Sequence, residues 1–374
     1  MDKHLHIIAL DVPWPSDYGG VVDIFFKITA LHKQGIKIHL HCFSGGRAPQ
    51  DELDKYCEKV YYYPRKKFLS GLSLRLPYIV SSRTDKELLK NLQLDDYPIF
   101  MEGTHCTYFL YCNALKHRKV FVRLHNIESV YYRKLAAIEK NYVKKIYFFA
   151  ESFLLKKYEK KLARKATFWP MSIHDTEVYK KEFGAKHIDF LPVFLPWHEV
   201  ILHKNKKGCF CLYHGNLSVN ENEKAAEWLL TKVFNSIDIP LVIAGKNPSE
   251  HLEALVHAHP NTCLVSNPSE KEIQDLIKKA QVNILPSFNN TGVKLKLLNA
   301  LYNGRFCLVN PAAIEGAAID NLCYLATTEE DFKQQAIDLY GQFFDEEATV
   351  HRQQVLNASY NNEKNALQII NWIY

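Results

Sequence analysis

Short apolar runs alternate with helix-forming segments along the chain, and this alternation constrains the possible folds more than any other feature. The runs are too short for helices and are bounded by turn residues, as expected of buried strands. In the first half they lie at 5–12, 36–43, 60–63, 97–101, 119–124, 168–169 and 188–191. In the second half they lie at 209–214, 240–244, 262–265, 282–285 and 306–309. Strands that alternate with helices form parallel sheets, so the sequence predicts an α/β fold.

The segments between these runs have the apolar spacing of amphipathic helices. In the first half we expect helices at 21–33, 84–92, 105–116, 129–165 and 174–183. In the second half we expect them at 221–236, 249–258 and 269–280, and again from 329 onward. The helix at 129–165 is unusually long, and we expect a break near residue 150. Asn126 precedes it and is the expected N-cap residue.

A connector divides the chain into two halves that each repeat the alternation. It contains Pro192, Pro196 and the polar segment 203–208. A chain of 374 residues is long enough for two domains of ordinary size. The sequence therefore predicts an N-terminal domain at 1–195 and a C-terminal domain at 196–359.

The composition narrows the functional class. The hydrophobic fraction of 47% and the charged fraction of 24% are typical of a globular protein. Nine scattered cysteines without a C-x-x-C pair argue against a zinc site and a disulfide framework, which favours a reducing compartment. The sequence has no apolar run of transmembrane length and no signal-peptide form at its N-terminus. We therefore expect a cytoplasmic protein, with peripheral attachment to the inner membrane face as an option.

The basic character of the chain is concentrated in one segment. The formal net charge is +6, yet residues 131–168 carry eleven Lys or Arg against three Glu, an excess of eight. The commoner interpretation is the solvated face of a core helix. The alternative is a surface that binds anionic lipid, favoured by Tyr147, Phe148 and Phe149 beside lysines. Nucleic acid is a weaker interpretation, because the charge lies on a helix also needed for packing.

The segment 286–304, P-S-F-N-N-T-G-V-K-L-K-L-L-N-A-L-Y-N-G, joins a strand to a helix through a polar loop. Gly292 lets a ligand approach the backbone, and the free N–H groups of a helix N-terminus favour an anion. Lys294 and Lys296 oppose the helix dipole unless an anion lies beside them. The pattern is therefore consistent with a phosphate site, or with a helix start that carries two solvated lysines.

Other loops at strand ends carry candidate ligand-binding residues. Gly19 and Gly20 precede a helix, but they do not form the dinucleotide pattern G-x-G-x-x-G, which argues against a dehydrogenase. His125 follows the strand at 119–124, where it is either a capping residue or a functional one. The loops at 215–218, 245–248 and 287–293 are expected to line one edge of the second sheet, a geometry that binds nucleotides.

Five motifs of the sequence resemble those of a known family. T-G-V-K-L-K-L-L-N-A-L-Y-N-G at 291–304 is similar to the nucleotide-sugar motif of retaining GT-B glycosyltransferases of the GT4 type. The resemblance continues, in the family's order, in four further motifs at 13–20, 123–129, 213–222 and 241–248. It implies two Rossmann-like domains that face each other across a cleft, with the nucleotide-sugar bound by the C-terminal one. It also implies that the last helix, about 360–374, packs back on the N-terminal domain.

The resemblance implies a role for each motif. His125 would lie near the transferred sugar as the catalytic residue. The donor would be bound by residues of both halves: Gly19, Gly20, Gly215, Asn216, Lys246, Thr291, Gly292, Val293, Lys294, Lys296 and Asn299. No Asp-x-Asp triplet flanks a strand, so we expect no metal and no cofactor besides the nucleotide-sugar substrate. The expected reaction is transfer of a hexose to a glycan or lipid-linked acceptor in polysaccharide or glycoconjugate synthesis.

This chain departs from the family pattern at four positions. The family usually has two glutamates where this sequence has Thr291 and Asn299, and an arginine and a lysine where it has Asn216 and Asn222. Asn299 can hydrogen-bond a ribose but carries no charge. These departures motivate the alternative that the protein binds a nucleotide or a partner without catalysis. A sugar-nucleotide epimerase typically uses paired histidines and carboxylates, and a glycoside hydrolase needs a pair of carboxylates. We recognise neither arrangement in this sequence.

Overall fold

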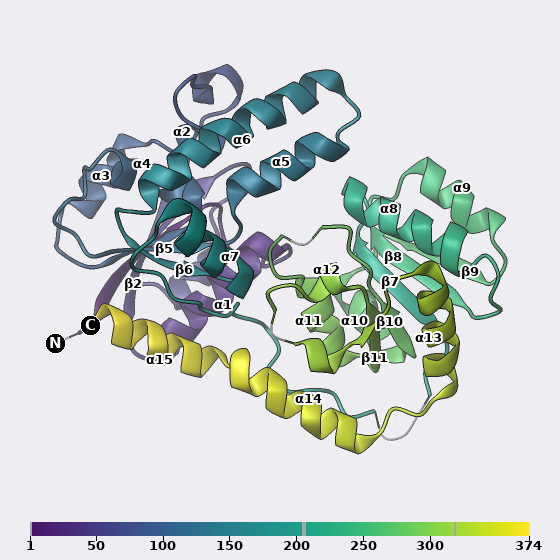
Figure 1. Cartoon of the computed structure of the whole chain (residues 1–374). Coiled ribbons are helices and arrows are strands. Elements are labelled where there is room, and N and C mark those ends of the chain that lie inside the picture. Colours follow the sequence, from purple (N-terminus) through teal and green to yellow (C-terminus); the bar gives the residue numbers. More distant parts are fainter. Residues whose placement is uncertain (1, 204–206, 290, 318) are drawn as a thin grey trace. The chain divides into compact units, whose positions relative to one another are not determined.

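Two six-stranded parallel sheets, each with its own helices, form the frame of the protein (Figure 1). The computed structural model describes residues 2–203, 207–289, 291–317 and 319–374. The chain divides into unit 1, Met1–Pro196 with Tyr360–Tyr374, and unit 2, Trp197–Ser359. The predicted α/β class with two Rossmann-like sheets is confirmed.

The sheet of unit 1 has the strand order β3-β2-β1-β4-β5-β6. Its strands are β1 (His4–Ala9), β2 (Lys37–Ser44), β3 (Lys59–Pro64), β4 (Ile99–Glu102), β5 (Val120–Leu124) and β6 (Thr167–Pro170). The chain moves outward from β1 to β3 and then returns to the other side of β1. The order therefore reverses between β1 and β4, where open α/β sheets bind their ligands.

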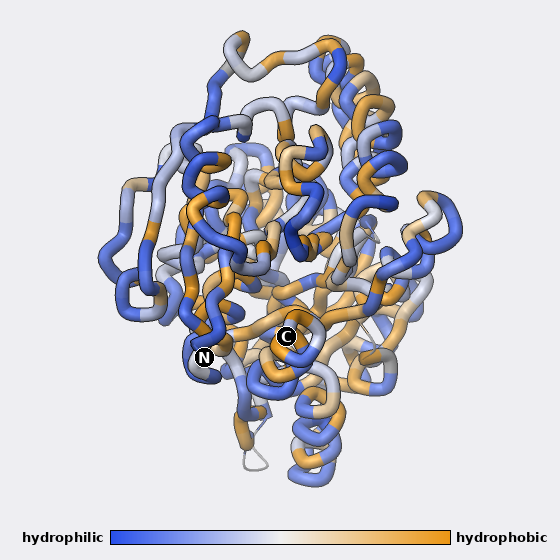
Figure 2. Tube along the Cα trace, turned by 90° about the vertical axis from the view of Figure 1, so that its left-hand side faces the viewer, coloured by the Kyte–Doolittle hydropathy of each residue, from blue (hydrophilic) through white to orange (hydrophobic). Residues whose placement is uncertain are grey.

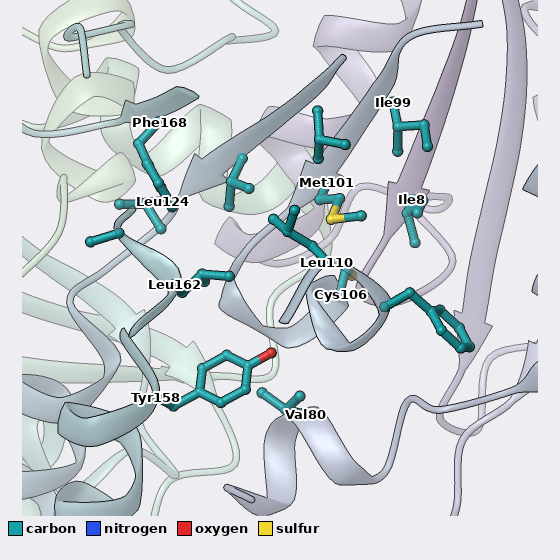
Figure 3. Close-up of a cluster of buried hydrophobic side chains, with 14 of the residues drawn as sticks. Ile8, Val80, Ile99, Met101, Cys106, Leu110, Leu124, Tyr158, Leu162 and Phe168 are labelled. Carbon is teal, nitrogen blue, oxygen red and sulfur yellow. The ribbon is translucent and has the colours of Figure 1, made fainter. Parts of the chain in front are cut away.

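Helices of unit 1 bury apolar residues against both faces of this sheet. They are α1 (Gly19–Lys33), α2 (Tyr78–Ser81), α3 (Lys86–Leu92), α4 (Tyr108–Tyr111), α5 (Glu128–Ile138), α6 (Tyr142–Leu162), α7 (Ile173–Val178) and α15 (Asn362–Ile373). Figure 3 shows one core cluster, in which Tyr158 and Leu162 of α6 pack near Leu124 and Phe168 of the sheet. The other cluster contains Ile369 and Ile373 of α15.

The last helix packs against α1, so the end of the chain completes unit 1. Its apolar positions Ala366, Ile369, Ile370 and Ile373 are buried, while its other positions are more polar. Figure 2 shows this alternation of blue and orange along the helix that ends at the label C.

Two expected elements of unit 1 are wrong. Residues 188–191 form a single bridge, between Phe168 and Ile188, and no seventh strand. The segment still runs beside β6, because the backbone N–H groups of Asp189 and Leu191 donate to the carbonyls of Phe168 and Pro170, each at 3.1 Å. The guanidinium of Arg123 donates to the carbonyls of Leu191 and Pro192 at its end. The expected helix at 105–116 is reduced to a 3-10 turn at Thr104–Cys106 and the single turn of α4.

The expected helix at 129–165 is two helices, α5 and α6, which pack against each other as a hairpin (Figure 1). The break lies between Ile138 and Tyr142, and not near residue 150. Asn141 explains its position, because its side-chain oxygen accepts from the backbone N–H groups of Val143 and Lys144, at 3.0 and 3.1 Å.

Asn126 does not cap α5, contrary to the expectation. The N-cap residue is Ile127, and the carboxylate of Glu159 on α6 takes the capping role. It accepts hydrogen bonds from the backbone N–H groups of Glu128, at 2.8 Å, and Ser129, at 3.2 Å. A buried acidic side chain therefore joins the two helices of the hairpin at the N-terminus of α5.

The sheet of unit 2 has the order β12-β11-β10-β7-β8-β9. Its strands are β7 (Cys211–Asn216), β8 (Leu241–Lys246), β9 (Thr262–Ser266), β10 (Val282–Ile284), β11 (Phe306–Val309) and β12 (Tyr324–Leu325). Its helices are α8 (Asn220–Trp228), α9 (Glu250–Ala258), α10 (Glu270–Lys279), α11 (Leu295–Asn303), α12 (Pro311–Ile314), α13 (Glu329–Gly341) and α14 (Glu346–Ser359). The strand order reverses between β7 and β10, so the loops after these two strands lie at the switch point.

Candidate functional site

The loops that follow β7, β8 and β10 contact one another at one edge of the unit 2 sheet. The backbone N–H of Leu217 donates to the carbonyl of Lys246, at 2.9 Å. The hydroxyl of Ser287 donates to the carboxylate of Glu221 on α8, at 3.0 Å. A Cβ on Gly245 would lie 1.9 Å from the carbonyl oxygen of Gly215, so glycine is required for this close approach.

The N-termini of α8 and α11 both open onto this edge, because these helices follow the neighbouring strands β7 and β10. Their N-cap residues, Val219 and Lys294, have no side-chain acceptor for the first N–H groups. Gly292 precedes α11 with a φ of 63°, in the left-handed region that favours glycine. The edge therefore presents two positive helix ends together.

Lys296 is the central cation of this edge. Its ammonium lies 3.0 Å from the side-chain oxygen of Asn222 and 3.3 Å from the hydroxyl of Tyr213. Burial lowers the pKa of Lys296 to about 8, although the negative charge of Glu221 acts to raise it. Lys294 donates to the carbonyl of Thr291, at 2.7 Å. A half-buried ammonium beside two helix N-termini is suited to an anionic ligand.

The remaining candidate residues of unit 2 lie around this cation. Asn299 is one turn after Lys296 on α11, and its side-chain oxygen accepts from the amide of Asn303, at 2.8 Å. Asn216 and Lys246 are register partners at the ends of β7 and β8. The side chain of Lys246 is exposed, and Val293 is half-buried before α11.

In unit 1, Gly19 and Gly20 form the first residues of α1, after β1. A Cβ on Gly20 would lie 2.9 Å from the ring of Tyr18. The tyrosine hydroxyl donates to Asp11, at 3.2 Å, so this ring is held over the helix start. The glycine pair therefore lies at the switch point of its own sheet.

His125 is held by a glutamate that the sequence analysis missed. Its Nε2 lies 3.1 Å from Oε2 of Glu102, which is fully buried at the end of β4. The two strands before these residues, β4 and β5, are neighbours. The only sequence signal was an acidic residue that ends an apolar run before Gly103.

A buried network of charges supports this pair. The ammonium of Lys27 lies 2.8 Å from Asp23 and 2.8 Å from Glu102. Arg123 binds Asp23 through two nitrogens, at 2.9 and 3.1 Å. Burial opposes the ionisation of Asp23, but Arg123 and Lys27 outweigh it and hold the pKa of Asp23 well below its usual value.

Asp23, Glu102 and His125 have ligand atoms within 4.8 Å of one another, a spacing that a metal ion can use. In this protein the Lys27 ammonium bridges the two carboxylates and supplies positive charge at that place. The arrangement is therefore better suited to orienting His125 than to binding a divalent cation.

The buried carboxyl group of Glu128 is expected to make the stability of the protein depend on pH. Burial, with repulsion from Glu159, raises the pKa of Glu128 to about 8. Between its unfolded pKa and pH 8 the folded state binds more protons, so the free energy of unfolding falls as pH rises through this window. We expect Glu128→Gln to match the wild type near pH 5 and to be about 2–4 kcal/mol more stable at pH 8.5.

Urea unfolding at pH 5, 7 and 8.5 measures this difference. Glu139→Gln, in the turn between α5 and α6, is the matched control and should show no such trend. A difference between Glu128→Gln and the wild type that does not change with pH would contradict the assignment.

Comparison with known proteins finds a family that matches part of the chain. Residues 209–342 match the model of the family described as glycosyl transferases group 1. A curated relative, an uncharacterised 44.6 kDa protein in the cps region of Klebsiella pneumoniae, is 29% identical over 84% of this chain and 84% of its own length.

Solved structures share the fold at low identity. The N-terminal domain of Candida albicans trehalose-6-phosphate phosphatase matches with a TM-score of 0.68 and 10% identity, over 99% of this chain and 96% of that one. Anabaena Alr3699/HepE, solved with UDP and glucose, matches with a TM-score of 0.66 and 11% identity over 99% of both chains. WaaG, a glycosyltransferase of lipopolysaccharide biosynthesis, gives the same values. The chain thus has the GT-B fold, and its residues 209–342 match the glycosyl transferases group 1 (GT4) family.

Proposed function

We propose that the protein is a retaining, metal-independent glycosyltransferase that moves a hexose from a nucleotide-sugar to a glycan or lipid-linked acceptor in polysaccharide synthesis. The observation that carries the proposal is the half-buried Lys296 ammonium beside the N-termini of α8 and α11. The UDP complex of the HepE structure and the cps-region location of the Klebsiella relative support it.

The unit 2 edge gives each part of the donor a partner in this proposal. The diphosphate would bind Lys294, Lys296 and the N–H groups after Gly292, which neutralise the leaving group. The ribose would lie near Asn299, one turn further along α11. Gly215, Asn216, Lys246, Thr291 and Val293 line the same strand ends.

Sugar transfer in this proposal follows a front-face path. The bond between the anomeric carbon and the phosphate oxygen breaks, and the acceptor oxygen bonds to that carbon on the same face. The leaving phosphate accepts the proton of the acceptor hydroxyl. The two buried carboxylates of unit 1, Asp23 and Glu102, both pair with Lys27. Neither is therefore suited to act as a nucleophile, which favours this path over a double displacement.

His125 is the proposed catalytic residue of unit 1, and Glu102 is the residue that positions it. Gly19 and Gly20 are proposed donor-binding residues of the same unit. We expect His125→Ala to lower kcat about 100-fold, because the transferred sugar would lose a hydrogen-bond partner in the transition state. We expect Glu102→Gln to lower kcat by about 10-fold with little change in donor KM, because the histidine loses its fixed orientation.

The double variant distinguishes this role from a general loss of structure. If Glu102 acts through His125, Glu102→Gln should add almost nothing to His125→Ala, and Glu102→Asp should recover part of the rate. Thermal unfolding of each variant measures whether loss of the buried ion pair between Glu102 and Lys27 destabilises the protein. Additive losses in the double variant would show that Glu102 does not act through the histidine.

The experiment that tests the function is a screen of UDP-, GDP- and other nucleotide-sugars by thermal shift, followed by assays of donor hydrolysis. One donor that stabilises the protein and is slowly hydrolysed supports the transferase and identifies its sugar. No shift with any donor would contradict the proposal.

The second candidate function is nucleotide or partner binding without catalysis. It is favoured by Asn299, whose side-chain oxygen is already used by Asn303, and by Asn222, which contacts Lys296. Binding of a donor without hydrolysis, and without transfer to acceptors in a membrane extract, would favour this candidate.

A further inference from the structure

Helix α6 has two apolar faces, and only one of them is buried. Leu155, Tyr158 and Leu162 recur at helical spacing and are buried in unit 1. On the opposite side, a second stripe is exposed to solvent: Tyr142 (82%), Val143 (78%), Ile146 (71%), Phe149 (48%) and Phe153 (54%). A core helix needs one apolar face, so the second stripe requires a separate explanation.

A neighbouring segment of unit 1 extends this exposed surface. Leu69, Leu72 and Leu74 are exposed by 83%, 54% and 98%. Leu72 and Leu74 line one groove together with Phe153, so the segment lies beside the stripe. Together, Leu69–Leu74 and the exposed face of α6 form what we call the apolar rim.

Positive charge surrounds the apolar rim. At 100° per residue, Lys145, Lys156, Lys157 and Lys160 lie within about 70° of the exposed stripe on α6. Arg65, Lys66, Lys67 and Arg75 flank the leucines, and no acidic residue lies between 60 and 84.

The acidic residues of the hairpin do not offset this charge. Glu151 is buried and accepts from the backbone N–H of Tyr78, at 2.7 Å. Glu159 is fully buried and caps α5. Of the three glutamates in the basic segment, Glu139 alone is partly exposed. The net charge at the surface is therefore more positive than the sequence count indicates.

We propose that the apolar rim and its lysines bind the surface of an anionic lipid bilayer. Aliphatic side chains at this exposure favour a non-polar phase, whereas the surrounding lysines complement anionic headgroups. A nucleic acid would use the charge but leave the exposed valine, isoleucine and leucines in water. No helix of the described residues is long and apolar enough to span a membrane, so the binding is interfacial. The inference does not rest on the proposed function, because it concerns binding alone.

Co-sedimentation with vesicles tests the proposal. We expect the full chain to bind phosphatidylcholine vesicles that contain about 30% phosphatidylglycerol, and to bind pure phosphatidylcholine weakly. The triple variant Lys145→Gln, Lys156→Gln and Lys157→Gln should bind the anionic vesicles on the order of 100-fold more weakly. The triple variant Val143→Ser, Ile146→Ser and Phe149→Ser should lose the binding that remains at high salt.

A matched control removes the same charge elsewhere. Lys232→Gln, Lys271→Gln and Lys279→Gln change three lysines of unit 2 and should leave vesicle binding unchanged. Thermal unfolding verifies that each variant is folded. Equal binding to neutral and anionic vesicles, or equal loss in the control, would overturn the proposal. So would a concentration-dependent dimer, abolished by the serine variant, in a protein that binds no vesicles.

Discussion

Replacing Lys296 with methionine is expected to weaken donor binding and sugar transfer by about 100- to 1,000-fold. The lysine supplies a half-buried positive charge beside two helix N-termini. Without it, a diphosphate bound there would lose its strongest partner. Isothermal titration with the donor found in the screen measures the loss. Lys271→Met, on α10 of the same unit, is the control and should bind as the wild type.

The same lysine predicts how donor binding depends on pH. Burial lowers its pKa to about 8, so the free protein loses this charge as pH rises through that value, and affinity for the donor should fall. The methionine variant should lose this pH dependence but remain folded, because an apolar side chain removes the cost of burying the ammonium. Unchanged affinity in Lys296→Met would place the diphosphate elsewhere.

Replacing Arg123 with methionine is expected to lower the free energy of unfolding by about 3–5 kcal/mol. Arg123 is fully buried and binds Asp23 through two hydrogen bonds, and it also donates to the carbonyls of Leu191 and Pro192. Its loss leaves a buried carboxylate with less compensation and two carbonyls without this donor. Urea denaturation measures the change.

A second variant shows whether the charge pair is the cause. Adding Asp23→Asn to Arg123→Met should recover part of the stability, since the unpaired charge is then removed. Arg164→Met, at an exposed position after α6, should change the stability by less than about 0.5 kcal/mol. A loss below about 1 kcal/mol for Arg123→Met would mean that the network contributes little to stability.

Local sequence patterns predicted most of the fold because each strand and helix carries its own signal. The segment 282–309 is the clearest case, with β10, α11 and β11 close to their expected bounds. The break between α5 and α6 was misplaced because apolar spacing continues across it, whereas Asn141, a strong N-cap residue, marks its true position. The expected strand at 188–191 does hydrogen-bond along β6, but its pairing is limited to one isolated bridge, so it does not form a regular seventh strand.

Sequence spacing groups the candidate residues that one loop contains, but it does not reveal contacts between residues that are distant in the chain. Gly292, Lys294 and Lys296 lie within one motif, so spacing alone suggested either an anion site or a helix start with two solvated lysines. The pairing of β4 with β5 brings Glu102 to His125, and the packing of α1 brings Lys27 to Glu102. Each resembles an ordinary charged residue in its local sequence. Residue-by-residue patterns do not contain this information.

The packing of α15 on unit 1 also affects the order of folding during synthesis. Unit 2 ends at Ser359, so all of its residues are made before those of the last helix. Part of the unit 1 core, including Ile369 and Ile373, is synthesised only after the whole of unit 2. The N-terminal sheet must therefore wait, with apolar surface of α1 uncovered, while the whole of the other unit is translated. Chains that end at residue 359 and are released from the ribosome should hold a folded unit 2 and an incomplete unit 1, and a chaperone would act on this form.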